Sequence, residues 1–195
     1  DARIRLSANA PAGANHFAIR PYPAQLEETL LWQGRELCLR PIRPEDEALH
    51  TEFLQHLEPE DVRMRVFYSK RTMERSELAR LVQIDYAREM AFVALAPGPD
   101  GQPQTLGVVR AIADPDNVEA EIGVIVRSDL KGAGLGRLLM QKLIAYLRSQ
   151  GTQRLVATVL DCNARMLKLA KDLGFEEASA KEDGGDTKGI SLSLR

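Results

Sequence analysis

One stretch of the sequence, EAEIGVIVRSDLKGAGLGRLLM from Glu119 to Met140, limits the possible folds more than any other. Its first part is rich in β-branched apolar residues up to Val126, which is typical of a buried strand. Glycines at positions 132, 134 and 136 then permit a sharp bend and the close approach of a ligand to the backbone. From Leu135 to Leu147 apolar residues mostly recur at helical spacing, which predicts a helix with one buried face. We therefore expect a strand, a glycine-rich turn and a helix in direct succession.

The N-terminus of this helix is a predicted phosphate site, because it presents free N–H groups and the positive end of the helix dipole. A Walker P-loop would need Gly-Lys followed by Ser or Thr, whereas Arg137 and Leu138 follow Gly136. The dinucleotide fingerprint would need a glycine at position 139, which is Leu139, and a longer alternation of strands and helices around the turn. Both of these phosphate-binding classes are therefore disfavoured.

The segment from Lys131 to Gly136 matches the pattern Arg/Gln-x-x-Gly-x-Gly/Ala directly after a strand, with lysine in the first position. It resembles the acetyl-CoA pyrophosphate loop of the GNAT acetyltransferase superfamily. The resemblance implies acetyl-CoA as cosubstrate, its pantetheine arm along the strand and its pyrophosphate on the loop amides, whereas the alternative is a turn that only packs. The residues expected at acetyl-CoA are Val124, Ile125 and Val126 on the strand, Lys131, Gly132, Ala133, Gly134, Leu135, Gly136 and Arg137 in the loop and helix, and Asn163 on the next helix.

Composition excludes several other classes of protein. The net charge is −2 and no long basic run occurs, which argues against nucleic-acid binding. No apolar run approaches the roughly 20 residues of a membrane span. Cys38 and Cys162 form no CxxC pair and suit a reducing cytoplasm. His16, His50 and His56 join no pattern of ligands, so we expect no metal.

Residues 1–33 are predicted to be a linker, with one short strand at 2–6, because prolines and a glycine interrupt regular structure there. The segments DARIRL and AIRPYP resemble the junction after an ATP-grasp-like acyl-CoA synthetase module in bacterial Pat-type protein acetyltransferases. That resemblance implies a C-terminal piece of a larger enzyme.

Residues 34–195 are predicted to form an α/β domain with a mixed, mostly antiparallel sheet flanked by helices. Strands are expected over 36–42, 90–95, 105–113, up to 126, 154–160, 175–178 and 190–194, and helices from 44, from 59, over 74–84, 135–150 and 163–173. This order resembles the GNAT fold throughout, and residues 114–175 (DPDN, the glycine-rich stretch and LAKDLGF) resemble the Pat-type branch. The helices of residues 44 to about 65 would then form one wall of the acceptor cleft.

Acetyl transfer from a thioester to an amine requires a base for the amine proton and donors for the oxyanion. Pat-type enzymes carry their proposed catalytic glutamate at the place of Glu121, so the resemblance implies that Glu121 is the general base. The alternatives are an ion pair of Glu121 with an arginine such as Arg110, or catalysis by Glu119 on the same strand face. The Val124 amide is the expected donor to the thioester carbonyl.

The second helix after the loop begins at Asn163, a good N-cap residue that in this superfamily often also touches coenzyme A. Many GNAT enzymes place a tyrosine general acid seven residues later. Here that position is Ala170, so the sequence leaves the general acid open. Cys162 has no histidine nearby in sequence and is not expected to act as a nucleophile.

The Pat-type resemblance implies a protein Nε-lysine acetyltransferase, with AMP-forming acyl-CoA synthetases among its substrates. Acidic residues between Asp114 and Glu121 would favour a cationic acceptor if they rim the cleft. A small-molecule amine N-acetyltransferase and a non-catalytic acyl-CoA sensor stay open as alternatives. The sequence indicates neither the acyl-chain preference nor the oligomeric state.

Overall fold

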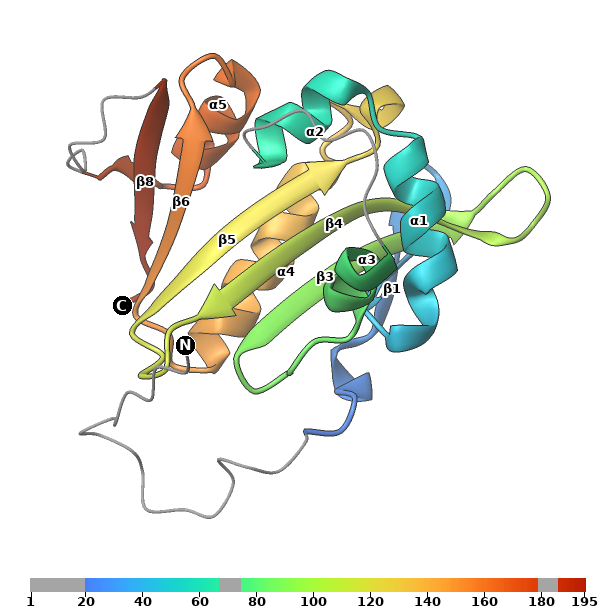
Figure 1. Ribbon diagram of the computed structural model, residues 1–195, viewed down its shortest axis with the longest axis horizontal. Coiled ribbons are helices and arrows are strands. Elements are labelled where there is room, and N and C mark those ends of the chain that lie inside the picture. Colours follow the sequence, from blue (N-terminus) through green and yellow to red (C-terminus); the bar gives the residue numbers. More distant parts are fainter. Residues whose placement is uncertain (1–19, 67–74, 179–185) are drawn as a thin grey trace.

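The computed structural model describes residues 20–66, 75–178 and 186–195. One sheet of eight strands runs through it in the order β1-β2-β3-β4-β5-β6-β8-β7 (Figure 1). Every neighbouring pair is antiparallel except β5 and β6, which are parallel. The strands are β1 (Glu28–Trp32), β2 (Arg35–Pro41), β3 (Glu89–Pro97), β4 (Pro103–Ala113), β5 (Glu119–Val126), β6 (Arg154–Leu160), β7 (Glu176–Glu177) and β8 (Thr187–Ser193).

Helices cover both faces of this sheet (Figure 1). The long helix α4 lies behind it, whereas α1, α2 and α3 lie in front. The helices are α1 (Glu47–Gln55), α2 (Pro59–Val66), α3 (Arg75–Val82), α4 (Leu135–Ser149) and α5 (Ala164–Asp172), with short 3-10 turns η1 (Ala24–Leu26), η2 (Pro44–Asp46) and η3 (Ser128–Leu130).

The sheet separates two apolar clusters, because successive side chains of a strand point to opposite faces. The larger cluster lies against α4, where Leu139 and Leu143 are fully buried. Gly107 of β4 permits this contact, since a Cβ added there would lie 2.9 Å from Leu139 Cδ1. The smaller cluster lies between the front face and α1 and α3, around Phe53 and Val108.

The helices and strands predicted for residues 34–195 are confirmed, with small shifts at their ends, and one further strand, β1, is present. The strand predicted over 154–160 has the observed bounds, and the last strand begins three residues earlier than predicted, at Thr187. The predicted strand at 2–6 lies outside the described residues. In the described part of the chain, no helix is long and apolar enough to cross a membrane.

The predicted boundary at residue 34 misses the first strand. Residues 28–32, assigned from sequence to the linker, form β1 and pair with β2. This strand has only five residues and lies at the edge of the sheet, where Leu31 is 79% exposed. Its apolar residues therefore do not follow the pattern of a buried strand. Trp32 is buried, and its indole N–H donates to the carbonyl of Ala133 at 3.1 Å. The segment before residue 34 therefore supports the glycine-rich loop directly.

We expect Leu139→Ala to lower the free energy of unfolding by about 3–5 kcal/mol, because it opens a cavity under α4 in a fully packed core. Leu31→Ala is the matched control, since its side chain is exposed, and it should change stability by about 0.5 kcal/mol or less. Urea unfolding of both variants tests this. Equal losses would contradict the assigned core.

A buried histidine should make stability depend on pH. His50 of α1 is buried, and its Nδ1 has no hydrogen-bond partner among the described residues. Burial, helped by Arg110 and opposed by Asp46, lowers the pKa of His50 to about 4 from 6.5. The unfolded chain therefore binds a proton first as the pH falls, and stability is lost from about pH 6.5 down to about pH 4.

Between pH 7 and pH 5 the His50 contribution amounts to about 2 kcal/mol. In the variant His50→Gln this part of the pH dependence should disappear. His56→Gln, at the exposed end of the same helix, should keep the wild-type pH dependence. Urea unfolding at the two pH values measures the difference, and parallel curves for wild type and His50→Gln would contradict the assignment.

Candidate active site

Strands β5 and β6 separate part-way along their length, and this separation creates the site (Figure 1). Their parallel pairing covers only residues 119–121 of β5 and 154–156 of β6. Beyond Glu121 the two strands diverge, and a cavity of about 770 Å³ lies between them. Its walls come from β5, the glycine-rich loop, the start of α4, β6, α5 and α2. A volume of this size is typical of a small-molecule site.

The free edge of β5 faces this cavity. Arg127 N–H donates to the Leu106 carbonyl at 2.9 Å, and Asp114 N–H donates to the Glu119 carbonyl at 2.8 Å. Backbone groups alternate in direction along a strand, so the odd-numbered residues of β5 bond to β4. The N–H and C=O groups of Val124 and Val126 therefore point toward the open side. They can bond an extended ligand as they would bond a neighbouring strand.

The glycine-rich loop has the backbone geometry of an anion site. Gly132 and Gly134 have φ of +79° and +83°, a region that favours glycine. Apart from the glycine itself and its two neighbours in the chain, no atom lies within 4 Å of the position where either would carry a Cβ. Gly134 is the N-cap of α4, so the N–H groups of the first helical residues lack an acceptor within the helix. These donors point out of the helix end toward the space that the loop leaves free.

Several positive side chains line the cavity. Lys131 and Arg137 line it, as do Arg165 and Lys168, which lie three residues apart on α5. Arg137 forms an ion pair with Asp172 at 2.7 Å. Arg137 is thus an ion-paired helix residue that also lines the cavity.

An ionic contact joins the loop to helix α2. The Asp61 carboxylate accepts hydrogen bonds from Lys131 Nζ and from Ser128 Oγ. Ser128 Oγ in turn accepts from the Glu58 N–H at 2.9 Å. The Asp61 side chain is 13% exposed. This contact fixes the start of α2 against the turn that follows β5, so α2 becomes one wall of the cavity.

Most of the residues predicted to bind acetyl-CoA line this one cavity. Ala133 does not line it, and its carbonyl is turned to Trp32 instead. Ile125 lines it, although its backbone groups bond to β4. The other lining residues from the predicted set are Val124, Val126, Lys131, Gly132, Gly134, Leu135, Gly136, Arg137 and Asn163.

The N-terminal end of α5 and the residue before it also belong to the site. The Asn163 side chain accepts from the Met166 N–H at 3.1 Å, which confirms the N-cap. Cys162 beside it is exposed and lines the cavity. Ala170 is buried in the larger core cluster, where a tyrosine would not fit without repacking. The structure therefore places no substitute general acid at this position.

Glu121 lies at the point where β5 and β6 separate, on the front face of the sheet. Its side chain is exposed and does not itself line the cavity, whereas Ile122 and Gly123 do. Glu121 is thus accessible to solvent. The alternative pair with Arg110 is not formed, because Arg110 binds Glu89 and the Leu81 carbonyl.

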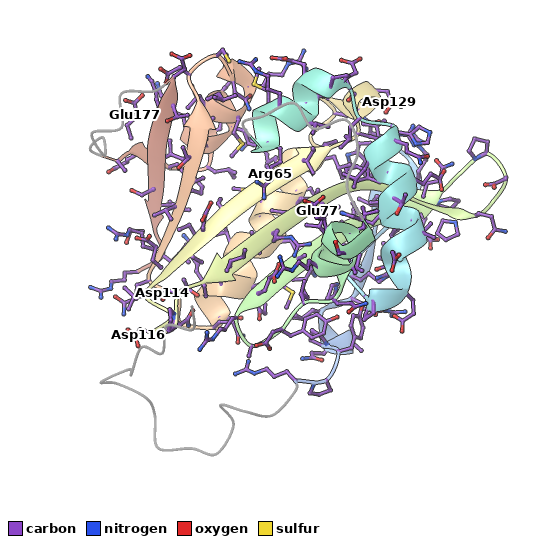
Figure 2. The ribbon with its side chains drawn as sticks, in the orientation of Figure 1. Arg65, Glu77, Asp114, Asp116, Asp129 and Glu177 are labelled. Atoms are coloured by element: carbon purple, nitrogen blue, oxygen red, sulfur yellow. The ribbon has the colours of Figure 1, made fainter. Side chains whose placement is uncertain are left out.

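The acidic cluster predicted at the cleft lies at the other end of β5. Glu119 forms an ion pair with Arg154 at 2.5 Å. Asp114 accepts from the backbone N–H of Val118 at 2.8 Å and so closes the turn before β5. Figure 2 shows Asp114 and Asp116 at this turn, away from the loop. Asp114, Asp116 and Glu119 therefore do not line the cavity, so these three acids give no argument for a cationic acceptor.

Sequence reasoning did not single out Arg65 of α2, which lines the cavity (Figure 2). Its guanidinium lies against Gly123, and a Cβ added to that glycine would lie 2.3 Å from Arg65 Cζ. Helix α2 has few apolar residues, so its sequence does not show which side chains face the sheet. The contact of Arg65 with Gly123 of β5, which is distant in sequence, identifies this residue. The one hint in the sequence is Gly123 itself, because a glycine inside a strand often marks a place where another group approaches the backbone closely.

Comparison with known proteins decides the family. The family model "Acetyltransferase (GNAT) domain" matches residues 36–176. The chain belongs to the GNAT acetyltransferase family. As a GNAT acetyltransferase it uses acetyl-CoA, and the residues present fit this cosubstrate: a free strand edge for the arm, and loop amides and cations for the phosphates. Among the described residues, no group of three His, Cys, Asp or Glu side chains could hold a metal ion.

Several acetyltransferases resemble most of the chain. Acetyltransferase PA5475 of Pseudomonas aeruginosa is 32% identical over 142 residues, which are 73% of this chain and 76% of the relative. Acetyltransferase Pat of Mycolicibacterium smegmatis is 31% identical over 80% of this chain, which spans only 44% of that relative. The GNAT domain of S. lividans PAT matches 89% of this chain and 99% of that domain, with a TM-score of 0.78 and 23% identity.

A further acetyltransferase matches a shorter region. The L-methionine sulfoximine/L-methionine sulfone acetyltransferase of Pseudomonas aeruginosa is 39% identical over 74 residues, which are 38% of this chain and 43% of the relative. The GNAT fold and the resemblance to Pat-type enzymes expected from the sequence are thus confirmed.

We expect Gly134→Ala to weaken acetyl-CoA binding by tenfold or more, because alanine is strained at a φ of +83° and the loop backbone that should present its amides to phosphate must shift. Gly101→Ala is the matched control: Gly101 has a similar φ of +77° but lies in the β3–β4 turn. Each variant should lose about 1–2 kcal/mol of stability. Calorimetric titration with acetyl-CoA should separate them, and equal affinities would contradict the loop assignment.

Proposed function

We propose that this domain is a protein Nε-lysine acetyltransferase. The observation that carries the proposal is the similarity to Acetyltransferase Pat over 80% of the chain. The likeness of fold to the GNAT domain of S. lividans PAT is consistent with it.

In the proposed reaction a lysine amine attacks the thioester carbonyl, so that a C–N bond forms and the C–S bond breaks. Glu121 would accept the proton that the ammonium group must lose, since a lysine of pKa about 10.4 is almost fully charged at neutral pH. The Val124 N–H, on the free edge of β5, would donate to the carbonyl oxygen as negative charge develops. Water is the proposed proton source for the departing thiolate.

The surface around Glu121 supports a lysine acceptor. Ile112 of β4 lies directly opposite Glu121 in the sheet register and is 52% exposed. An exposed apolar side chain next to an exposed carboxylate is complementary to lysine, whose stem is apolar and whose end is a cation. The lysine stem would lie on Ile112 while its amine reaches Glu121.

We further propose that the domain works within a larger cytoplasmic enzyme whose partners include AMP-forming acyl-CoA synthetases. The chain spans less than half of the Pat relative, and residues 1–33 resemble a junction after a synthetase-like module. The free thiols of Cys38 and Cys162 are compatible with a reducing compartment.

Acetylation of a free amino acid is the second candidate function. It is favoured by the relative that acetylates L-methionine sulfoximine, which matches 74 residues of this chain. An arginine in the cavity wall, Arg65, could bind the carboxylate of such an acceptor. Labelled acetyl-CoA offered in parallel to an acyl-CoA synthetase and to free amino acids and polyamines separates the two functions. Label on the protein supports the first, and label on amino acids alone supports the second.

We expect Glu121→Gln to lower kcat by about 10²- to 10⁴-fold, because the amide cannot accept the amine proton. Binding of acetyl-CoA should stay close to wild type, since Glu121 does not line the cavity. Steady-state transfer to a lysine peptide, together with acetyl-CoA titration, measures both quantities.

Glu119→Gln is the matched control for this experiment, because Glu119 lies two residues earlier on the same face but is paired with Arg154. It should reduce kcat less than about threefold. A Glu121→Gln enzyme with wild-type kcat would remove Glu121 as the base, and a large loss in Glu119→Gln alone would transfer that role to Glu119.

A further inference from the structure

Arg65 stands out among the cavity residues because its position is built by two elements far apart in sequence. It comes from the last turn of α2, and its guanidinium covers Gly123 in the middle of β5. Any larger residue at position 123 would occupy the space of the guanidinium. Among the residues that the structure describes, none accepts a hydrogen bond from this side chain. The wall of the cavity thus holds a cation in a fixed place.

The charges around Arg65 leave room for an anion. Glu121 attracts the guanidinium from the same strand face, and Arg110 repels it. Arg110 is itself engaged by Glu89 and the Leu81 carbonyl. Burial is the main cause that lowers the pKa of Arg65, followed by Arg110. A buried guanidinium such as that of Arg65 is stabilised when an anionic group binds in the cavity and accepts its hydrogen bonds.

The position of Arg65 assigns this anion to the acceptor and not to acetyl-CoA. The edge of β5 that should bind the pantetheine arm lies in the plane of the sheet. Arg65 lies above the front face, on the same side as Glu121, because Gly123 and Glu121 are two residues apart. The phosphate site lies beyond the other end of β5, where Lys131 and Arg137 supply its cations.

We propose that Arg65 selects acceptors that carry a carboxylate close to the reacting amine. This inference rests on the proposed function, since it assumes that the amine is delivered to Glu121. Positions two residues apart on a strand are separated by about 7 Å. Glu121 and Arg65 would therefore bind the two charges of one compact acceptor, the amine on Glu121 and the carboxylate on Arg65.

The carboxylate that Arg65 would bind can belong to either of two kinds of acceptor. The carboxylate is either an acidic side chain next to the target lysine of a protein or the α-carboxylate of a free amino acid. Arginine binds either one through two parallel N–H donors. The experiment therefore uses pairs of acceptors that differ only in this group: a lysine peptide with a neighbouring Asp or Asn, and free methionine sulfone or its carboxamide.

We expect wild type to prefer the carboxylate member of at least one pair in kcat/KM, and Arg65→Gln to reduce that preference by about 10- to 100-fold. The matched control is Arg63→Gln on the same helix, whose side chain is paired with Glu60 and does not line the cavity. It should keep the preference. Gly123→Ala should lower it while the arginine is retained, because the new methyl group displaces the guanidinium.

Binding of the same acceptors to the CoA-loaded protein, measured by calorimetry, gives a second readout that does not need turnover. The proposal is supported by a carboxylate preference, in binding or transfer, that falls in Arg65→Gln and not in Arg63→Gln. It is overturned if wild type shows no preference in either measurement, or if Arg65→Gln reduces both members of a pair equally.

The same data keep the two proposals apart. Transfer to lysine peptides without a carboxylate preference would leave the lysine acetyltransferase function intact and remove only the role of Arg65. A preference confined to the free amino acid would support the role of Arg65 and replace protein lysine by amino acids as the acceptor class. A preference within the peptide pair would support both proposals.

Discussion

The site depends on a single constraint, which is that β5 loses its neighbour half-way along the sheet. Pairing with β6 ends at Glu121, and the groups of Val124 and Val126 on the open side have no strand to bond. Unpaired backbone groups in a protein interior are costly, so an open strand edge persists where a ligand or water completes it. The same divergence creates the cavity, directs the free edge into it and leads the chain to the glycine-rich loop.

Side chains and backbone groups alternate in direction along β5, so neighbouring residues of this strand have different roles. Even-numbered residues present backbone groups to the cavity and side chains toward α4, as Val126 does against Gly136. Odd-numbered residues place their side chains on the front face, where Glu121 and the space above Gly123 face α2. A one-residue slip in register would exchange these roles, because the side-chain period of a strand is two. The buried pairs of β4 and β5 fix that register.

Helix α2 has a weak apolar pattern and is held in place largely by polar contacts. Asp61 binds Lys131 and Ser128 after β5, and Arg65 lies on Gly123 of the strand itself. These contacts connect the α2 wall of the cavity to the glycine-rich loop through a few side chains. An anion bound at the loop would compete with Asp61 for Lys131, and it would thereby weaken one of the contacts that hold α2.

The sequence by itself determined the order of the elements, the buried face of α4 and the glycine-rich turn before it, because these features depend on local periodicity and on glycine backbone freedom. It also identified most of the cavity lining around that loop, since these residues follow one another along the chain. The tertiary structure alone decided that β1 belongs to the sheet, that Asp61 binds Lys131 and that the acidic residues before β5 lie away from the cavity. It alone placed Arg65 on Gly123. Each of these depends on contacts between segments distant in sequence, which a pattern within one segment does not encode.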